Sequence, residues 1–171
     1  MERGPARIWA HLVCDARSVR RSFPDPVLER IEQAVSEGER RHGAEVRIAI
    51  EAGMHWTRVL RGVSPRERAI EVFSELRVWD TEANNGVLLY LLLADHAIEI
   101  VADRAAAAAL STARMQQACE RLRAAFVEER YEQGVLEALA VLHEDLALAF
   151  PISAQAGHAD ADELPNRPAI L

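Results

Sequence analysis

The sequence contains no lysine, so all 20 of its basic residues are arginines. Asp and Glu together number 27, which leaves a formal net charge of −7 at pH 7. This balance argues against a nucleic-acid-binding protein, because binding to phosphates needs a surplus of positive charge. Cysteine is also scarce. Cys14 and Cys119 lie far apart, which favours neither a disulfide framework nor a cysteine-based metal site and indicates a reducing compartment.

Long apolar runs are missing as well, and aromatic residues are few. The longest apolar run, Gly86–Ala94, is about half of what a membrane-spanning helix requires. Residues 1–5 do not resemble the start of a signal peptide. We therefore expect a cytoplasmic protein without a transmembrane segment. The 171 residues are 50% hydrophobic but only 5% aromatic, which predicts one soluble domain packed through aliphatic side chains and helices.

Helical periodicity and capping signals recur along the chain. Residues 6–21 carry apolar side chains at helical spacing and predict an opening helix. Asp25 is a good N-cap and predicts a second helix, which Gly43 ends. The capping box of Ser64 and Glu67 predicts the start of a third helix. Three helical stretches follow near the end of the chain, at residues 105–109, 115–126 and 135–146.

Three other segments have the pattern of strands. Residues 45–51 alternate between apolar and other side chains, which predicts a strand with one buried side. Residues 86–93 are apolar on both faces, as expected of a central strand covered by helices on each side. Residues 98–102 resume alternation after a short polar break, which predicts an antiparallel hairpin with the preceding strand. Residues 52–63 are predicted to be a loop.

The predicted elements divide the chain into three parts. Residues 1–22 form an N-terminal helix, residues 23–150 form an α/β domain, and residues 151–171 form a tail. The tail contains glycine, prolines and scattered aspartates but no apolar stripe, so we expect it to be disordered.

The sequence is similar to the TPM domain family in three segments: ERRHGAEVRIAIE at 39–51, RVWDTEANNGVLLY at 77–90 and IVADR at 100–104. The resemblance covers about residues 20 to 150. It implies a three-layer α/β/α sandwich with a small mixed central sheet, helices on both faces and two C-terminal helices.

The same resemblance implies several functions. Acid phosphatase activity and divalent cation binding are proposed for plant members, whereas other members look like accessory or assembly factors. Many bacterial relatives carry membrane anchors or are encoded beside a LemA-like protein. We expect this chain to lack an anchor, and it is similar to the short, soluble bacterial subgroup. A LemA-like protein or a membrane-associated complex is therefore the partner that the resemblance implies.

The strand pattern predicts a site without the family. The hairpin brings Asp103 back beside Asn85, and Glu45 joins the same edge if the first strand runs parallel to the second. Carboxylate and amide oxygens are the ligands that Ca²⁺ or Mg²⁺ requires. We predict the metal ligands Asp80, Asp103, Asn85 and Glu45, with Thr81, Asn84 and Arg104 as further candidates. The opposite end of the hairpin offers Asp95, His96 and Glu51. This end is an alternative location for the site, because ligands of α/β sheets often lie at strand carboxyl ends.

Structural roles compete with this interpretation. Asn85–Gly86 is typical of a turn with positive φ, and Asp103 is a suitable N-cap for the next helix. The six histidines show no zinc-ligand spacing. Trp56 and Trp79 are predicted to pack in the core, with an exposed recognition surface as the alternative.

Two classes of function follow. The first is a non-catalytic accessory domain that binds a divalent cation or a protein partner, since the polar residues include no nucleophile with a neighbouring base. The second is a metal-assisted acid phosphatase, in which Asp80 and Asp103 hold the cation and Arg104 holds the phosphate.

Overall fold

The structure is a computed structural model that describes residues 4–152 and 163–171. Its sheet has the strand order β3–β2–β1–β4. The strands are β1 (Val46–Glu51), β2 (Val87–Leu92), β3 (Ala97–Ala102) and β4 (Ala169–Ile170). β1 runs parallel to β2 and to β4, whereas β2 and β3 form the antiparallel hairpin expected from the sequence. The predicted mixed sheet is confirmed.

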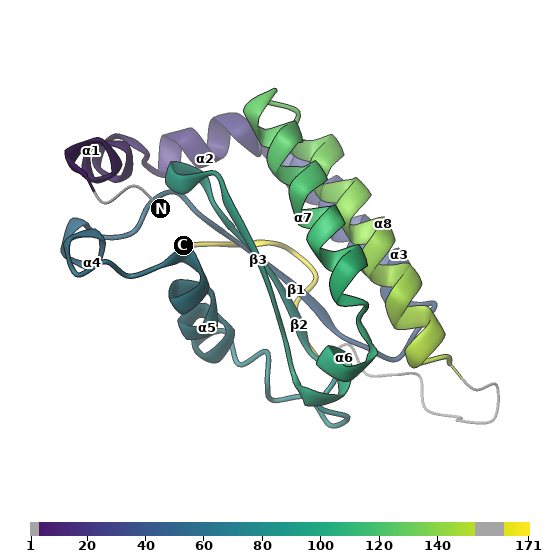
Figure 1. The fold of residues 1–171 in the computed structure, drawn as a ribbon. Coiled ribbons are helices and arrows are strands. Elements are labelled where there is room, and N and C mark those ends of the chain that lie inside the picture. Colours follow the sequence, from purple (N-terminus) through teal and green to yellow (C-terminus); the bar gives the residue numbers. More distant parts are fainter. Residues whose placement is uncertain (1–3, 153–162) are drawn as a thin grey trace.

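Helices cover both faces of this sheet (Figure 1). One layer contains α3 (Asp25–Glu39), α7 (Thr112–Val127) and α8 (Tyr131–Ala149), and the other contains α4 (Trp56–Leu60) and α5 (Pro65–Glu75). The remaining helices are α1 (Pro5–Val13), α2 (Ala16–Ser22), the single turn η1 (Leu93–Asp95) and α6 (Arg104–Ala109). Each face of the sheet has its own buried apolar cluster. The predicted three-layer α/β/α sandwich, with its two C-terminal helices, is therefore confirmed.

Local signals explain the best-predicted elements. The hydroxyl of Ser64 accepts a bond from the Glu67 amide (3.1 Å), and the Glu67 carboxylate accepts one from the Ser64 amide (2.7 Å), so the predicted capping box begins α5. Every residue of β2 is buried, as its apolar sequence indicates. Within the described part of the chain, none of the helices has the length and apolar character needed to cross a bilayer.

Two helical predictions need correction. The single helix expected at residues 6–21 is interrupted, because the Asp15 carboxylate accepts bonds from the amides of Arg17 (3.0 Å) and Ser18 (3.1 Å) and starts a new helix, α2. The loop expected at residues 52–63 contains α4. A helix of about one turn is too short to show a periodic pattern.

β1 also differs from its prediction. Alternation indicated one buried side, but all six residues of β1 are buried. Arg47 and Glu51 on the second face are only 9% and 8% exposed. Residues from distant parts of the chain pair with these charges and bury them. The sequence of the strand alone cannot predict such long-range partners.

The prediction of a disordered tail is wrong for residues 163–171, which we call the carboxyl-terminal segment. This segment forms β4 against β1, and its Leu164 is 6% exposed. A two-residue strand has no period that a sequence could reveal. Residues 153–162 of the predicted tail lie outside the described residues.

A buried histidine pair joins the start of β1 to α8. The Ala44 amide donates to Nδ1 of His42 (3.2 Å), which leaves Nε2 of His42 to donate to Nδ1 of His143 (2.8 Å). Nε2 of His143 is buried and has no hydrogen-bond partner among the described residues. α3 passes so closely that a Cβ at Gly38 would lie 2.1 Å from Cε1 of His143. The space therefore fits two neutral rings and offers no acceptor for an additional proton.

This pair predicts acid sensitivity. Burial lowers the pKa of His42 to about 4 and that of His143 to about 3. In the unfolded chain both rings take up protons near pH 6.5, so the unfolded state binds more protons below that pH. The free energy of unfolding should fall as the pH drops from 6.5 towards 4, by about 2 kcal/mol per histidine between pH 7 and pH 5.

Denaturant unfolding at several pH values checks this expectation. The variant His42→Gln/His143→Gln should show a much flatter pH dependence, whereas His55→Gln, at an exposed histidine, should keep the wild-type slope. A wild-type slope no steeper than that of the double variant would contradict the prediction.

Candidate functional site

The predicted site residues lie at one end of the sheet, where β1 and β2 begin and β3 ends. We call this end the amino-terminal edge. The Asp103 amide donates to the Gly86 carbonyl (2.8 Å), the Ala105 amide to the Asn84 carbonyl (3.1 Å), and the Val87 amide to the Glu45 carbonyl (2.8 Å). The main chains around Glu45, Asn84–Gly86 and Asp103 are thereby brought together, as the hairpin and the parallel first strand predict.

Asn85 is the most buried polar residue of this edge, with 2% exposure. Its amide donates to Oγ1 of Thr81 (3.1 Å), and its side-chain Nδ2 donates to the Gly43 carbonyl. Its Oδ1 is buried and has no hydrogen-bond partner among the described residues. A buried acceptor oxygen without a donor is costly, so a bound water or cation would stabilise this position.

The carboxylates of this edge differ in burial and in hydrogen bonding. Glu45 is buried, and its Oε2 accepts a bond from the Leu164 amide (3.1 Å) in the carboxyl-terminal segment. The Asp103 carboxylate accepts a hydrogen bond from the Arg104 amide (2.6 Å) and caps α6, which is the N-cap role predicted from the sequence. Asp80 is exposed. Among the described residues, no group of three His, Cys, Asp or Glu side chains is already arranged to hold a metal ion.

The loop before β2 bends at a different residue from the one expected. Asn84 has the positive φ (53°), whereas Asn85–Gly86 was predicted to supply it. Gly86 is required for another reason: a Cβ there would lie 1.9 Å from the Val78 carbonyl oxygen. This close approach places Trp79 and Asp80 beside the amino-terminal edge. Trp79 is 51% exposed and Trp56 is 45% exposed, so the prediction that both pack in the core is wrong.

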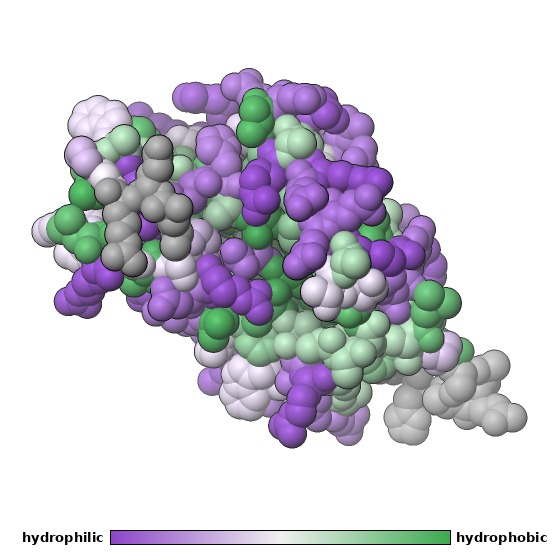
Figure 2. Space-filling view, in the orientation of Figure 1, coloured by the Kyte–Doolittle hydropathy of each residue, from purple (hydrophilic) through white to green (hydrophobic). Residues whose placement is uncertain are grey.

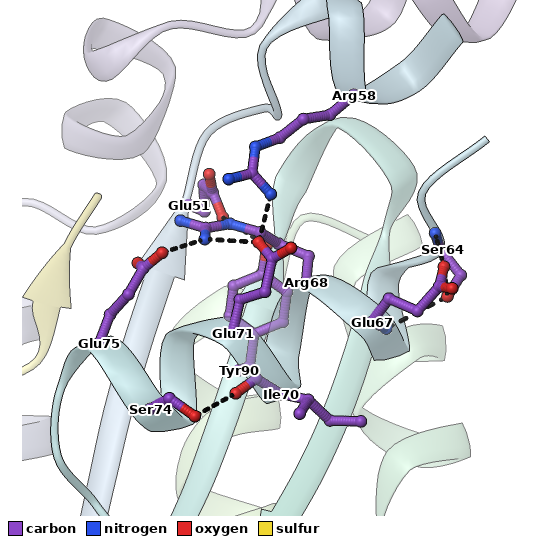
Figure 3. Close-up of polar contacts among 10 residues, drawn as sticks. All are labelled: Glu51, Arg58, Ser64, Glu67, Arg68, Ile70, Glu71, Ser74, Glu75 and Tyr90. Carbon is purple, nitrogen blue, oxygen red and sulfur yellow. Dashed lines mark hydrogen bonds and ion pairs between the residues drawn. The ribbon is translucent and has the colours of Figure 1, made fainter. Parts of the chain in front are cut away.

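The opposite end of the sheet holds an ionic network built around a buried pair, Glu51 and Arg68 (Figure 3). Nε of Arg68 donates to Oε2 of Glu51 (2.9 Å), and the Tyr90 hydroxyl donates to the same oxygen (2.6 Å). Nη1 of Arg68 also reaches Glu71 (3.2 Å) and Glu75 (2.8 Å). Burial and the adjoining Glu51 carboxylate raise the pKa of Tyr90 far above its usual value, so this hydroxyl stays a hydrogen-bond donor.

A second cluster at this end attaches α1 to the turn after β2. Arg7 donates from Nε and Nη2 to the two carboxylate oxygens of Asp95 (2.9 and 2.8 Å). Nε2 of His11 lies 3.1 Å from Oδ1 of Asp95, and Nδ1 of His11 accepts the Met54 amide (2.9 Å). Burial alone would raise the pKa of Asp95, but His11 and Arg7 outweigh it and hold that pKa well below its usual range. Nδ1 of His11 is thus hydrogen-bonded, whereas its buried Nε2 lies close to Asp95 without meeting hydrogen-bond geometry. The cluster attaches α1 to the turn after β2.

Sequence reasoning considered Glu51 and Asp95 but missed their partners. Arg68 lies four residues before Val72, on the apolar stripe of α5, and an arginine on such a stripe is the signal that could have indicated a buried ion pair. Arg7 and His11 share a face of α1 at a spacing of four residues, which is a weaker signal.

Another hollow of the described surface lies away from the amino-terminal edge. An open groove of about 1140 Å³ runs between α1–α2 and the start of α8, with Cys14, His96 and Tyr131 in its walls. Burial raises the pKa of the Cys14 thiol, which disfavours the nucleophilic thiolate. No predicted metal ligand lines this groove.

Comparison with known proteins gives a consistent result. The family model described as the TPM domain matches residues 23–144. A comparison with the curated proteins finds none that matches. Among solved structures, the fold is similar to the NMR structure of BA42 protein from the psychrophilic bacterium Bizionia argentinensis, with a TM-score of 0.73 and 23% sequence identity. The match covers 87% of this chain and 95% of BA42, and at this identity it shows a shared fold.

The buried network predicts the effect of removing one hydroxyl. Tyr90→Phe deletes the donor to Glu51, so the free energy of unfolding should fall by about 2 kcal/mol, the usual range for a buried hydrogen bond to a charged group. Denaturant unfolding measures this loss. Tyr131→Phe is the matched control, because the Tyr131 hydroxyl has no hydrogen bond within the described structure, and it should cost less than about 0.5 kcal/mol. Equal losses in the two variants would refute the role of the Tyr90 hydroxyl.

Proposed function

Because the chain belongs to the TPM domain family, we propose that it is a non-catalytic accessory domain that binds a divalent cation at the amino-terminal edge and docks a protein partner there. The observation that carries the proposal is Oδ1 of Asn85, a buried oxygen without a donor among the described residues. An amide oxygen is a suitable ligand for Ca²⁺, which takes carbonyl and carboxylate oxygens at about 2.3–2.6 Å.

Two carboxylates on neighbouring loops could complete the ligand set. Asp80 is exposed and follows Val78, whose carbonyl touches Gly86. Asp103 is joined to Gly86 by a main-chain bond and uses one oxygen to cap α6. A small rotation of either side chain costs little, whereas Glu45 is bound to the Leu164 amide. We therefore assign Asn85, Asp80 and Asp103 as the ligands and leave Glu45 as a buried negative charge nearby.

The surface beside this edge supports a partner-binding role. Trp79, directly before Asp80, is half exposed, and exposed tryptophans often contribute strongly to protein interfaces. The alanine-rich α6 follows Asp103, and Figure 2 shows weakly apolar residues gathered over its position on this face of the molecule. Exposed small apolar side chains on α6 and an exposed tryptophan before Asp80 both suit contact with a protein surface. A LemA-like protein is the candidate that the family suggests.

The acid phosphatase remains a second candidate because of one further feature. Arg104 is exposed at the start of α6 and makes no ion pair within the described structure. A cation at this edge and the Arg104 guanidinium would both favour a phosphate group. Hydrolysis of a phosphomonoester that depends on the cation and is lost in Arg104→Gln would favour this candidate over the non-catalytic one.

Thermal unfolding with chelator, Ca²⁺ or Mg²⁺ tests the cation site. A cation at a hundredfold excess over its dissociation constant should raise the free energy of unfolding by about 2.7 kcal/mol. Asp103→Asn and Asp80→Asn should lose most of this gain. Asparagine at position 103 retains a good N-cap, so the fold is preserved while a charge is removed.

Glu29→Gln is the control, because it removes one exposed carboxylate on α3 and should keep the full cation effect. An unchanged melting temperature of the wild-type protein with both ions would contradict the proposed function. An increase that persists in both aspartate variants would place the cation elsewhere.

A further inference from the structure

The carboxyl-terminal segment lies along the outer edge of β1 and contacts it mainly through its main chain. Ala169 pairs with Ala49 and Ile170 with Ile50, in parallel orientation. The Leu171 amide donates to the Ile50 carbonyl (3.0 Å). In Figure 1 this segment, drawn in yellow, crosses beside β1 as the last strand of the sheet. The edge of β1 that would otherwise be open is thus closed by an added strand.

Two buried charged residues at the start of β1 bind main-chain atoms of the segment. The Glu45 carboxylate accepts the Leu164 amide (3.1 Å). The Arg47 guanidinium donates to the carbonyl oxygens of Pro165 and Arg167. Side chains that bind amides and carbonyls recognise an extended backbone more than particular side chains, which is how proteins bind peptides by strand addition.

Two side chains of the segment add specificity. Leu164 is buried in the smaller apolar cluster together with Ala49. Arg167 forms ion pairs with two residues of α3. Its Nη2 lies 3.2 Å from Oδ1 of Asp25, and its Nη1 lies 3.4 Å from Oε2 of Glu32. The groove along β1 therefore fits an extended peptide with a leucine that enters the core and an arginine three residues later.

The rest of the fold is organised without this segment. The larger apolar cluster contains none of its described residues, and the smaller one takes only Leu164 and, at its margin, Ala169. Pro151 at the end of α8 bridges to His42 just before β1, and residues 153–162 connect that point to the segment. An identical segment can therefore replace it on the β1 edge without disturbing the central layers.

We propose that the outer edge of β1, with Glu45, Arg47 and Ala49, is a peptide-binding groove, and that it exchanges its own carboxyl-terminal segment for that of a second copy of the chain. A second copy brings an identical segment and identical contacts, so exchange sacrifices no interaction. The chain's own segment is covalently linked and competes with that of the second copy, so the exchanged dimer forms when the cis contact alone is damaged or when the protein is concentrated.

Complementation between two full-length variants tests the exchange. Arg47→Ala damages the groove but keeps the natural segment, whereas Leu164→Asp damages the segment but keeps the natural groove. Each variant alone should be monomeric by analytical ultracentrifugation. An equimolar mixture should form a heterodimer, in which the intact segment of the first variant occupies the intact groove of the second.

The matched control is a mixture of Arg47→Ala with the double variant Arg47→Ala/Leu164→Asp. Neither protein in this mixture has an intact groove, so it should stay monomeric. Val127→Thr, at a residue of α7 that is 70% exposed and lies outside both the groove and the segment, should behave like the wild-type chain. A monomeric mixture of the two complementary variants would overturn exchange between copies.

A labelled synthetic peptide with the sequence of residues 163–171 provides an independent measurement. It should bind saturably to the full-length Leu164→Asp variant and at least tenfold more weakly to the double variant. Equal binding to both, or none, would overturn the groove itself. If a variant does not fold, the natural chain with a protease site placed within residues 153–162 can be cleaved, and failure of the labelled peptide to replace the cleaved segment would overturn the proposal.

Discussion

The second face of β1 carries charges that must be paired or hydrogen-bonded inside the protein, and much of the structure follows from this constraint. Glu45, Arg47 and Glu51 are each less than 10% exposed. A buried charge costs several kcal/mol unless it is paired and hydrogen-bonded. Glu51 is satisfied by Arg68 of α5 and Tyr90 of β2, whereas Glu45 and Arg47 are satisfied by the main chain of the carboxyl-terminal segment. The helix layer and the added strand on this face therefore have an electrostatic as well as an apolar basis.

This arrangement separates the two ends of the sheet. At the end near Glu51, the buried carboxylate is already bound by Arg68 and Tyr90, so these groups serve stability. At the amino-terminal edge, Oδ1 of Asn85 lacks a donor, Asp80 is exposed and Arg104 is unpaired within the described structure. These unsatisfied polar groups are the basis on which a ligand site is proposed at this edge. Because the carboxyl-terminal segment uses Glu45, its position also affects the charge available at that edge.

Most of the fold could be predicted from local patterns. The apolar β2 indicated helices on both faces, and the capping box of Ser64 fixed the start of α5. The hairpin register correctly brought Asp103 beside Asn84–Gly86. The missed features depend on contacts between distant residues: the two-residue β4, the use of Glu45 by Leu164, and the exposure of Trp79. Arg68 on an apolar stripe was a readable signal of a buried pair, but its partner Glu51 could be identified only in three dimensions.

A double-mutant cycle on Glu51 and Arg68 tests the central claim most directly. Removing either partner leaves the other charge buried and unpaired, so Glu51→Leu and Arg68→Leu should each lower the free energy of unfolding by about 3–5 kcal/mol. The double variant removes both charges and should cost much less than the sum, with a coupling energy of at least about 2 kcal/mol. Additive losses, with no coupling between the two positions, would show that the buried charges do not depend on each other and would contradict this account.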